Sequence, residues 1–562
     1  MPLTGALNAG VGLAGLINIG LAGLAAGGGG GTPAPVEAYD LPYPTDVRLE
    51  SSLLAPEVDG NDQVTTWPDM MGLADAVRIT GGTLPPGGAP KVVTDHAGRT
   101  GVLFEGQHAL EVQDTLANYS GNNCTVYAVI RYLDAASSTA QSVFGIGRNA
   151  SGTAPNTLRA FMNHLGSFQA SGVAANSQPP FLAHGSKYLV NGDKVLGNER
   201  VAGQSRRKMI LHAGIQVVAI AGGSSSTAEI HMNDEYCTGI TTMNTGTATT
   251  SGGEIGRHAY DPRSSTYGTF ILYGLFIQRS KQTTAQIQAN IGAMMDAYGV
   301  VPIEHQLILD GDSRFADSGP SIMGESKQGY LGPQINYELE RQGIRNWRVI
   351  NHAIGGSTID ADDGGTGQAI DKGLRQKRDY LNNSMFSGNW TLPGRNVVAV
   401  EIWHNDSSQT LNAKYTAPVY GAARADQIYA NLIDLVRNDT RSYLALGYEY
   451  MAGISLPGST TMDAGLQQMR GHLRAASFFE DFGGQPGGPY EGKVRRAENP
   501  LSMQVTGAWG DYVLDPALSS TDPRLNSQGG IYYADQAHQR AVCQPFMAKC
   551  MVDRLLGADP YV

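Results

Sequence analysis

The chain has 562 residues, of which 40 are basic and 51 acidic, for a formal net charge of −11. This length allows several domains and a large core. An acidic chain without a basic run cannot neutralise many phosphates, which argues against a nucleic-acid partner. Only 16% of the residues are charged and 72 are glycine, a composition that favours turn-rich β structure over long solvated helices.

Residues 1–40 form an unusual N-terminal segment. Apolar or small residues recur there at alternating spacings of four and three, as in a coiled-coil seam: Leu3, Leu7, Gly10, Ala14, Ile17, Leu21 and Leu24. The glycines from 27 to 31 and the Pro-containing stretch after them read as a linker. We expect a docking or oligomerisation segment. A disordered tail is the second alternative and membrane insertion the third. No Lys or Arg precedes the apolar stretch, so the charged start of a signal peptide is missing.

Residues 41–300 show short alternating segments between clusters of Gly, Ser, Thr and Asn, which is typical of an all-β sandwich. The strands expected with most support span 125–131, 142–147, 216–221 and 229–232. The pattern Trp67-Pro68-Asp69 and the strand 101–106 resemble elements of the laminin-G and concanavalin-A-like jelly rolls. That resemblance implies a sugar-binding or spacer role. Trp67 and Phe104 themselves are expected in the core, because large aromatic side chains are usually buried.

The region closes with an amphipathic stretch from Thr283 to Tyr298, which predicts a helix that leads directly into residues 301–562. No cluster of oxygen ligands nominates a calcium site in the sandwich, and no spacing of His and Cys indicates another metal. We predict no cofactor. We expect the four cysteines to be free buried thiols. A disulfide between Cys124 and Cys237 is the alternative.

Residues 301–562 place reactive side chains where apolar strands end. Ser313 follows the strand 307–309, Gly356 follows 349–351 and Asn405 follows 397–402. Asp535 and His538 precede a helical stretch at the C-terminus. A serine becomes a nucleophile when a histidine takes its proton and a carboxylate orients that histidine. We therefore predict Ser313, His538 and Asp535 as catalytic, with the N–H groups of Ser313 and Gly356 and the Asn405 amide as an oxyanion hole.

These blocks, in this order, resemble the SGNH/GDSL hydrolases, and the resemblance covers about residues 303–556. It implies a flavodoxin-like α/β/α domain of the kind found in esterases, lipases and carbohydrate deacetylases. Trp403 stands where that family usually has glycine. Trp403 and His404 precede the predicted oxyanion-hole residue Asn405, and Trp509 lies on an irregular segment where it could stack on a sugar ring. These three are candidate substrate-binding residues, with packing in the loops as the alternative for Trp509.

The predicted fold class is thus a multidomain chain: an N-terminal docking segment, a jelly-roll sandwich and a flavodoxin-like SGNH hydrolase domain. The predicted function is a serine esterase that removes O-acetyl groups from a cell-surface polysaccharide. The N-terminus resembles the anchoring end of a phage tail fibre or tailspike, which implies a homotrimer, virion tail partners and a virion location. Two alternatives stay open. They are a secreted bacterial carbohydrate esterase with a lectin-like module and a non-catalytic receptor-binding virion protein.

Overall fold

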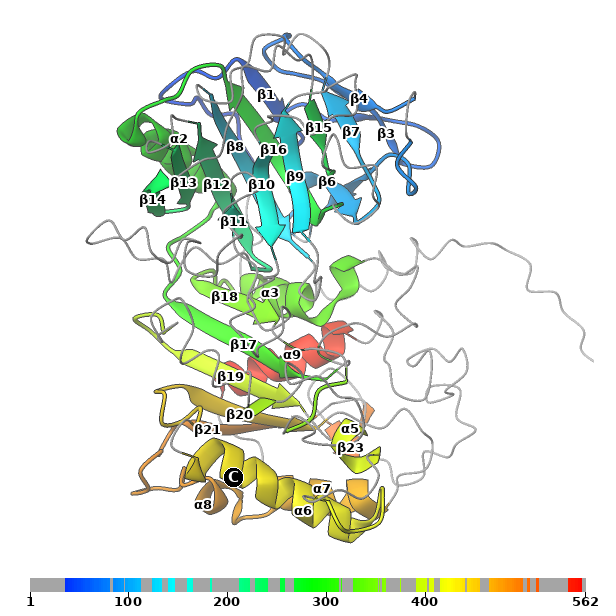
Figure 1. Cartoon of the computed structure of the whole chain (residues 1–562), viewed down its shortest axis with the longest axis vertical. Helices are drawn as coiled ribbons and strands as arrows, with labels where there is room; N and C mark the ends of the chain where they lie inside the picture. Colours follow the sequence, from blue (N-terminus) through cyan, green and yellow to red (C-terminus); the bar gives the residue numbers. More distant parts are fainter. Residues whose placement is uncertain are drawn as a thin grey trace, which may run out of the picture.

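The computed structural model places a β-sandwich at one end of the long axis and a parallel sheet with its helices at the other (Figure 1). It describes residues 36–557 with gaps. The gaps are 81–83, 96, 113–123, 134–139, 147–158, 165–181, 184–211, 223–227, 241–252, 258–266, 313–314, 316–326, 352, 354–355, 360–373, 376–390, 402–403, 409–414, 440–441, 455–463, 499–502, 506–511 and 515–543. Residues 1–40 of the predicted docking segment lie outside this part of the chain, except for 36–40.

The sandwich consists of two antiparallel sheets, each of eight strands among the described residues. The first sheet runs in the order β14 (Glu235–Ile240), β13 (Ala228–Met232), β12 (Ile215–Ala221), β8 (Thr125–Tyr132), β16 (Thr269–Gln278), β6 (Thr100–Glu105) and β5 (Lys91–Thr94), with β1 (Val47–Glu50) also paired to β16. The second runs β11 (Leu182–Ala183), β10 (Arg159–His164), β9 (Ala140–Ile146), β15 (Gly253–Ile255), β7 (Leu110–Val112), β4 (Ala76–Arg78), β3 (Val64–Trp67) and β2 (Glu57–Val58). The strands predicted at 125–131, 142–147, 216–221 and 229–232 are all present.

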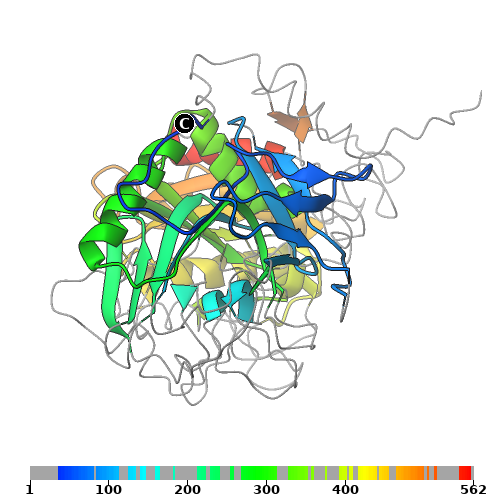
Figure 2. The ribbon, with the colours of Figure 1, turned by 90° about the horizontal axis from the view of Figure 1, so that it is seen from above.

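The first sheet is covered on both faces. Its inner face packs against the second sheet around Trp67 and Phe104, which are fully buried in one apolar cluster, as expected for core aromatics. Its outer face packs against helix α2 (Thr284–Tyr298) through Ile287, Ile291 and Met294 (Figure 2). Burial on both faces explains why β8 and β16 are apolar along nearly their whole length rather than alternating.

The sequence contains capping signals at both ends of helix α2. Thr283 and Gln286 form a reciprocal capping box at its N-terminus. Gly299 ends it with a φ of 64°, in the left-handed region that favours glycine. The chain then runs on through residues 300–304 into the parallel sheet, so the helix predicted at Thr283 to Tyr298 links the two parts of the molecule.

The second part is built on a five-stranded parallel sheet in the order β18 (Trp347–Asn351), β17 (His305–Gly311), β19 (Asn396–Glu401), β20 (Glu449–Ile454) and β21 (Val494–Glu498). Helices α3 (Leu331–Arg341) and α9 (Gln544–Leu556) cover one face. Helices α6 (Ala422–Ile433), α7 (Ala464–Arg474) and α8 (Phe478–Asp481) cover the other. Alternation along β17 matches these layers, because Leu307 and Leu309 face α3 and α9 while Ile308 faces α6.

Shorter elements complete this part. They are η5 (Lys327–Gly329), α5 (His404–Ser408), η7 (Asp434–Asn438) and a small antiparallel pair of strands, β22 (Met503–Val505) with β23 (Tyr512–Leu514). Among the described residues, no helix is both long and apolar enough to cross a membrane. Cys124 is a buried free thiol, so the Cys124–Cys237 disulfide that the sequence left open is not formed.

The sandwich and the parallel sheet are joined by direct contacts. Ala213, in the turn before β12, donates its backbone N–H to the carbonyl of Val349 in the edge strand β18 at 3.2 Å. Arg131 of β8 is fully buried and donates to Glu340 of α3 at 2.9 Å and to Asn336 at 2.6 Å. The sandwich therefore covers an edge of the parallel sheet, which a free spacer module would not do.

The predicted fold class was a jelly roll followed by a flavodoxin-like SGNH domain. This prediction is corrected here. Sheets outweigh helices in the described part of the chain, and its two parts share a buried seam. The sequence motifs that led to the prediction are short, and they indicate strand ends and turns. Such features recur in many arrangements of strands and helices, so they do not identify one family.

Candidate functional site

Several polar side chains of the second part lie at the carboxyl edge of the parallel sheet: Asp310, Asp312, Glu401, Asn405 and Asp406. The chain passes from β17 to β18 on one side and then to β19 on the other, so the strand order reverses at β17. Loops after such neighbouring strands diverge, and they leave a crevice outside the carboxyl ends, where open parallel sheets bind ligands. The corresponding place in this chain lies between the ends of β17 and β19, and we call it the crevice on the ground of this topology.

Asn405 connects the loops at this crevice. Its side chain is half-buried at the start of α5, directly after β19. Its Nδ2 donates to the carbonyl oxygen of Ser357 at 3.0 Å and lies 3.4 Å from the Asp312 carboxylate. One amide therefore spans residues that follow β17, β18 and β19.

Two glycines shape the backbone around that amide. A side chain at Gly311, the last residue of β17, would clash with the carbonyl oxygen of Glu401 at the end of β19. The two strands can therefore approach closely only because position 311 is glycine. Gly356 adopts a φ of 83°, and its left-handed turn places Ser357 beneath Asn405. The Ser357 hydroxyl is buried and has no hydrogen-bond partner among the described residues.

Buried carboxylates support the crevice from below. Asp310 accepts a hydrogen bond from the Tyr443 hydroxyl at 2.6 Å. Asp406, next to Asn405, accepts from the Tyr415 hydroxyl at 2.6 Å and from the backbone N–H of Ile359 at 3.2 Å. Hydrogen bonds to buried charged groups are among the stronger ones, so they hold α5 and the turn at Gly356 in a fixed relation. The charged groups at this edge are therefore carboxylates.

The structure places only part of the predicted site. Gly356 and Asn405 lie at the same edge of the sheet, as described above. His404 begins α5, but its side chain is not described. The other predicted residues lie outside the described part of the chain: Ser313, Trp403, Trp509, Asp535 and His538. The catalytic and oxyanion-hole assignments therefore stay predictions.

Three residues at the crevice were not nominated from the sequence: Asp312, Ser357 and Asp406. Each is the immediate neighbour of a nominated residue. A signal was available, because a polar side chain directly after a buried strand end projects toward the same edge. Within the described residues no group of three or more His, Cys, Asp or Glu side chains is placed to hold a metal ion.

No protein-family model matches the chain, and no curated protein matches it either. Similar solved structures include a Trypanosoma rangeli sialidase in complex with the inhibitor DANA, at 10% identity and a TM-score of 0.28, covering 46% of this chain and 35% of that one. This chain thus spans about a third of the sialidase. Domain 4 of a GH43 extracellular arabinanase from Geobacillus stearothermophilus, in complex with arabinotriose, matches at 13% identity and a TM-score of 0.30, covering 44% of this chain and 98% of that one.

An arabinofuranosidase complexed with arabinofuranosyl-alpha-1,2-xylobiose matches at 13% identity and a TM-score of 0.31, over 42% of this chain and 51% of that one. The names of these structures are those of a sialidase, an arabinanase and an arabinofuranosidase. Similarity at these TM-scores assigns neither a fold nor an activity to this chain.

These findings correct the predicted activity. The similar structures carry glycoside hydrolase names, and no SGNH hydrolase, carbohydrate esterase or phage tail protein is among those described above. They do not support the prediction of a serine esterase or deacetylase, nor the alternative of a secreted esterase. They also do not support the assignment as a tail fibre or tailspike, nor the alternative of a receptor-binding virion protein. The predicted location, polysaccharide partner and homotrimer are not tested by them.

Proposed function

We propose that the chain binds a polysaccharide at the carboxyl edge of its parallel sheet, through Asn405, Asp312 and the turn at Gly356 and Ser357. The observation that carries the proposal is the Asn405 amide, which lies between the Ser357 carbonyl and the Asp312 carboxylate at the crossing of three loops. Its position in the switch-point crevice makes it the central polar group of the site.

The chemistry of the site favours a hydroxyl-rich ligand. A sugar hydroxyl donates one hydrogen bond and accepts others, which matches a carboxylate that accepts, an amide that does both and a serine hydroxyl without a partner among the described residues. Pockets for such ligands combine a few fixed polar groups with a rigid scaffold. A phosphorylated ligand fits poorly, because the charged side chains at this edge are all carboxylates: Asp310, Asp312, Glu401 and Asp406.

The proposal is tested by binding measurements on the full-length protein. Affinity electrophoresis through gels containing a panel of bacterial and plant polysaccharides would identify a ligand, and calorimetry would measure the affinity. Asn405→Ala should weaken binding about tenfold or more, which corresponds to about 1.4 kcal/mol. The reason is that truncation removes the donor and leaves the Ser357 carbonyl without its hydrogen bond.

Asn438→Ala is the matched control, since Asn438 is exposed in η7 beyond the far end of α6. It should bind as the wild type does. Equal affinity of the wild type and Asn405→Ala for every retained polysaccharide would contradict the proposed site. Retention of no polysaccharide would contradict the proposed function.

A further inference from the structure

A second cleft lies at the seam between the sandwich and the parallel sheet, with a volume of about 590 Å³. Its walls come from residues 37–40, from the last turn of α2 and from Arg345, which precedes β18. This volume is in the range of small-ligand sites, which often lie where two domains meet. The candidate site described above uses the carboxyl ends of the strands, whereas Arg345 stands at the amino end of β18.

The polar groups of the cleft are largely uncommitted. Glu37, Asp40 and Asp296 are exposed carboxylates that make no hydrogen bond or ion pair with another described residue. Within the same part of the chain, Arg345 makes one long hydrogen bond, from Nη1 to the Gly299 carbonyl at 3.5 Å. A guanidinium has five N–H donors, so most of those of Arg345 are available to a ligand.

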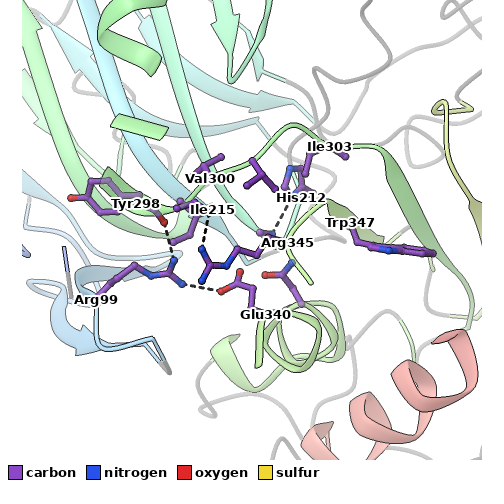
Figure 3. A pocket seen from close by; sticks show the side chains of 13 residues that line it. Arg99, His212, Ile215, Tyr298, Val300, Ile303, Glu340, Arg345 and Trp347 are labelled. Atoms are coloured by element: carbon purple, nitrogen blue, oxygen red, sulfur yellow. Dashed lines mark hydrogen bonds and ion pairs between the residues drawn. The ribbon is translucent and has the colours of Figure 1, made fainter. Parts of the chain in front are cut away.

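The second cation of the cleft is already used. Arg99 donates to Glu340 at 2.9 Å and to the Tyr298 carbonyl at 3.2 Å (Figure 3). It also donates to Asp95 at 2.8 Å. Its charge is therefore balanced inside the seam. The remaining charges at the cleft are three carboxylates and one guanidinium, an excess of acceptors that disfavours an acidic ligand.

Next to the cleft lies a small, partly open cavity of about 20 Å³, which shares Arg99, Tyr298, Gly299 and Arg345 with it. This space holds about one water molecule. His212 faces the cavity and is 3% exposed (Figure 3). Its Nδ1 accepts the N–H of Gly214 at 3.0 Å, so its proton lies on Nε2, which has no hydrogen-bond partner among the described residues.

We propose that the seam cleft is a second carbohydrate site, which takes a neutral sugar. Hydroxyls of the sugar donate to Glu37, Asp40 and Asp296 and accept from Arg345, while the small cavity takes one water or hydroxyl beside His212 Nε2. The apolar faces of Ala38, Ala293 and Ala297 supply a wall for the C–H face of the ring. Because its residues differ from those of the carboxyl edge, this site does not depend on the function proposed above.

The test compares neutral and acidic sugars of equal length on the full-length protein. Saturation-transfer NMR and calorimetry with maltotriose, cellotriose and mannotriose are set against trigalacturonic acid. We expect at least one neutral trisaccharide to bind, and the acidic one to bind at least about tenfold more weakly, since a tenfold ratio corresponds to about 1.4 kcal/mol. Arg345→Ala and Asp296→Asn should each reduce the affinity for the neutral sugar severalfold. Arg437→Ala, at an exposed arginine of η7, should leave it unchanged.

Asn405→Ala tests the carboxyl edge, whereas Arg345→Ala and Asp296→Asn test the seam cleft. Three results would overturn the second site: no binding of any neutral trisaccharide at the highest soluble concentration, equal or tighter binding of trigalacturonic acid, or wild-type affinity in both Arg345→Ala and Asp296→Asn. Asp296 is exposed, so its variant tests the proposal even if Arg345→Ala fails to fold. If Asn405→Ala loses binding while Arg345→Ala and Asp296→Asn keep it, the ligand binds at the carboxyl edge alone.

Discussion

Gly311 shows how much the candidate site depends on a single residue. A methyl group at this position would clash with the Glu401 carbonyl in the neighbouring strand, and a backbone atom cannot move aside easily. Gly311→Ala should therefore destabilise the protein by about 1–3 kcal/mol, the usual cost of overpacking. Urea denaturation of both proteins measures this change.

Gly292→Ala is the matched control for Gly311→Ala. Gly292 lies inside α2 with no atom within 4 Å of the position that a Cβ would take. Alanine there should stabilise the helix by about 0.5–1 kcal/mol. Similar unfolding midpoints for the two variants would show that the close approach of β17 and β19 is not a constraint.

Glu449 gives a prediction about acid stability. Burial raises the pKa of Glu449, but hydrogen bonds and charges from Arg395 and Arg495 outweigh it, and the pKa lies below its usual value. Arg395 Nη2 is 2.7 Å from a Glu449 oxygen, and Arg495 Nε is 3.3 Å away. A lowered pKa stabilises the fold above the pKa of the unfolded chain, and this stabilisation is lost as the pH falls through the pKa of the folded protein.

Glu449→Gln should therefore lower the free energy of unfolding at neutral pH more than at a pH below about 4, where the unfolded carboxyl group is protonated. Urea titrations of both proteins at the two pH values test the sign. The charge-based account would be contradicted if the difference in the free energy of unfolding between the wild type and Glu449→Gln were constant with pH or grew on acidification.

Residue-scale features were unevenly accessible from the sequence. Gly356 and Asn405 could be nominated because they follow apolar strands, and the structure puts their loops in contact. Asp312 and Ser357 were missed because their importance comes from one hydrogen-bonded amide that joins distant segments. Chain order does not specify which of several polar residues at a strand end meets a partner from another strand.

Among the elements, β8 and α3 make a buried ion pair across the seam. Arg131 is fully buried and lies 2.9 Å from Glu340, while Arg99 contacts the same carboxylate at 2.9 Å. Arg131→Leu leaves part of this buried acidic cluster uncompensated, with Asp95 and Glu340 facing one cation fewer. We expect a loss of about 3–5 kcal/mol in the free energy of unfolding.

The double variant Arg131→Leu with Glu340→Leu should recover part of that loss, because it removes both a buried cation and a buried carboxylate. Denaturant titrations of the single and double variants form the test. A single variant within about 1 kcal/mol of the wild type, the value of an exposed ion pair, would mean that the seam is open to water.

Elements were predicted best where the signal is local. The helix at α2 has its cap, its apolar face and its terminal glycine in sequence, and the strand at β8 follows from a continuous apolar run. The seam could not be predicted in this way, because a buried Arg131 looks in the sequence like any polar residue at a strand end. Its partners lie 205 and 209 residues away along the chain.

At the scale of the whole molecule, the seam predicts cooperative unfolding. Ala213 packs in the apolar cluster of the parallel sheet, which also contains Val349 of β18 and Leu339 of α3. We expect the full-length protein to unfold by calorimetry in one main transition. Arg131→Leu should divide it into two, since each part would then respond to heat alone. Two transitions in the wild type would contradict this coupling.

The sequence predicts a lectin-like sandwich with a sugar-binding or spacer role, followed by an esterase domain. The similar solved structures do not support that family, and the contacts at the seam do not support a detached spacer. The homotrimer expected from residues 1–40 stays a prediction. Light scattering of the full-length protein and of a variant without residues 1–40 would test it.

The hydrogen bond from Ala213 to Val349 also bears on biosynthesis. An exposed edge strand such as β18 can pair with another chain before the sheet is complete. The sandwich precedes it in the sequence and leaves the ribosome first, and domains generally fold as units in that order. A finished sandwich would thus offer the nascent β18 a backbone donor at the moment it is most exposed to aggregation, so the N-terminal part would act as a folding template carried within the chain.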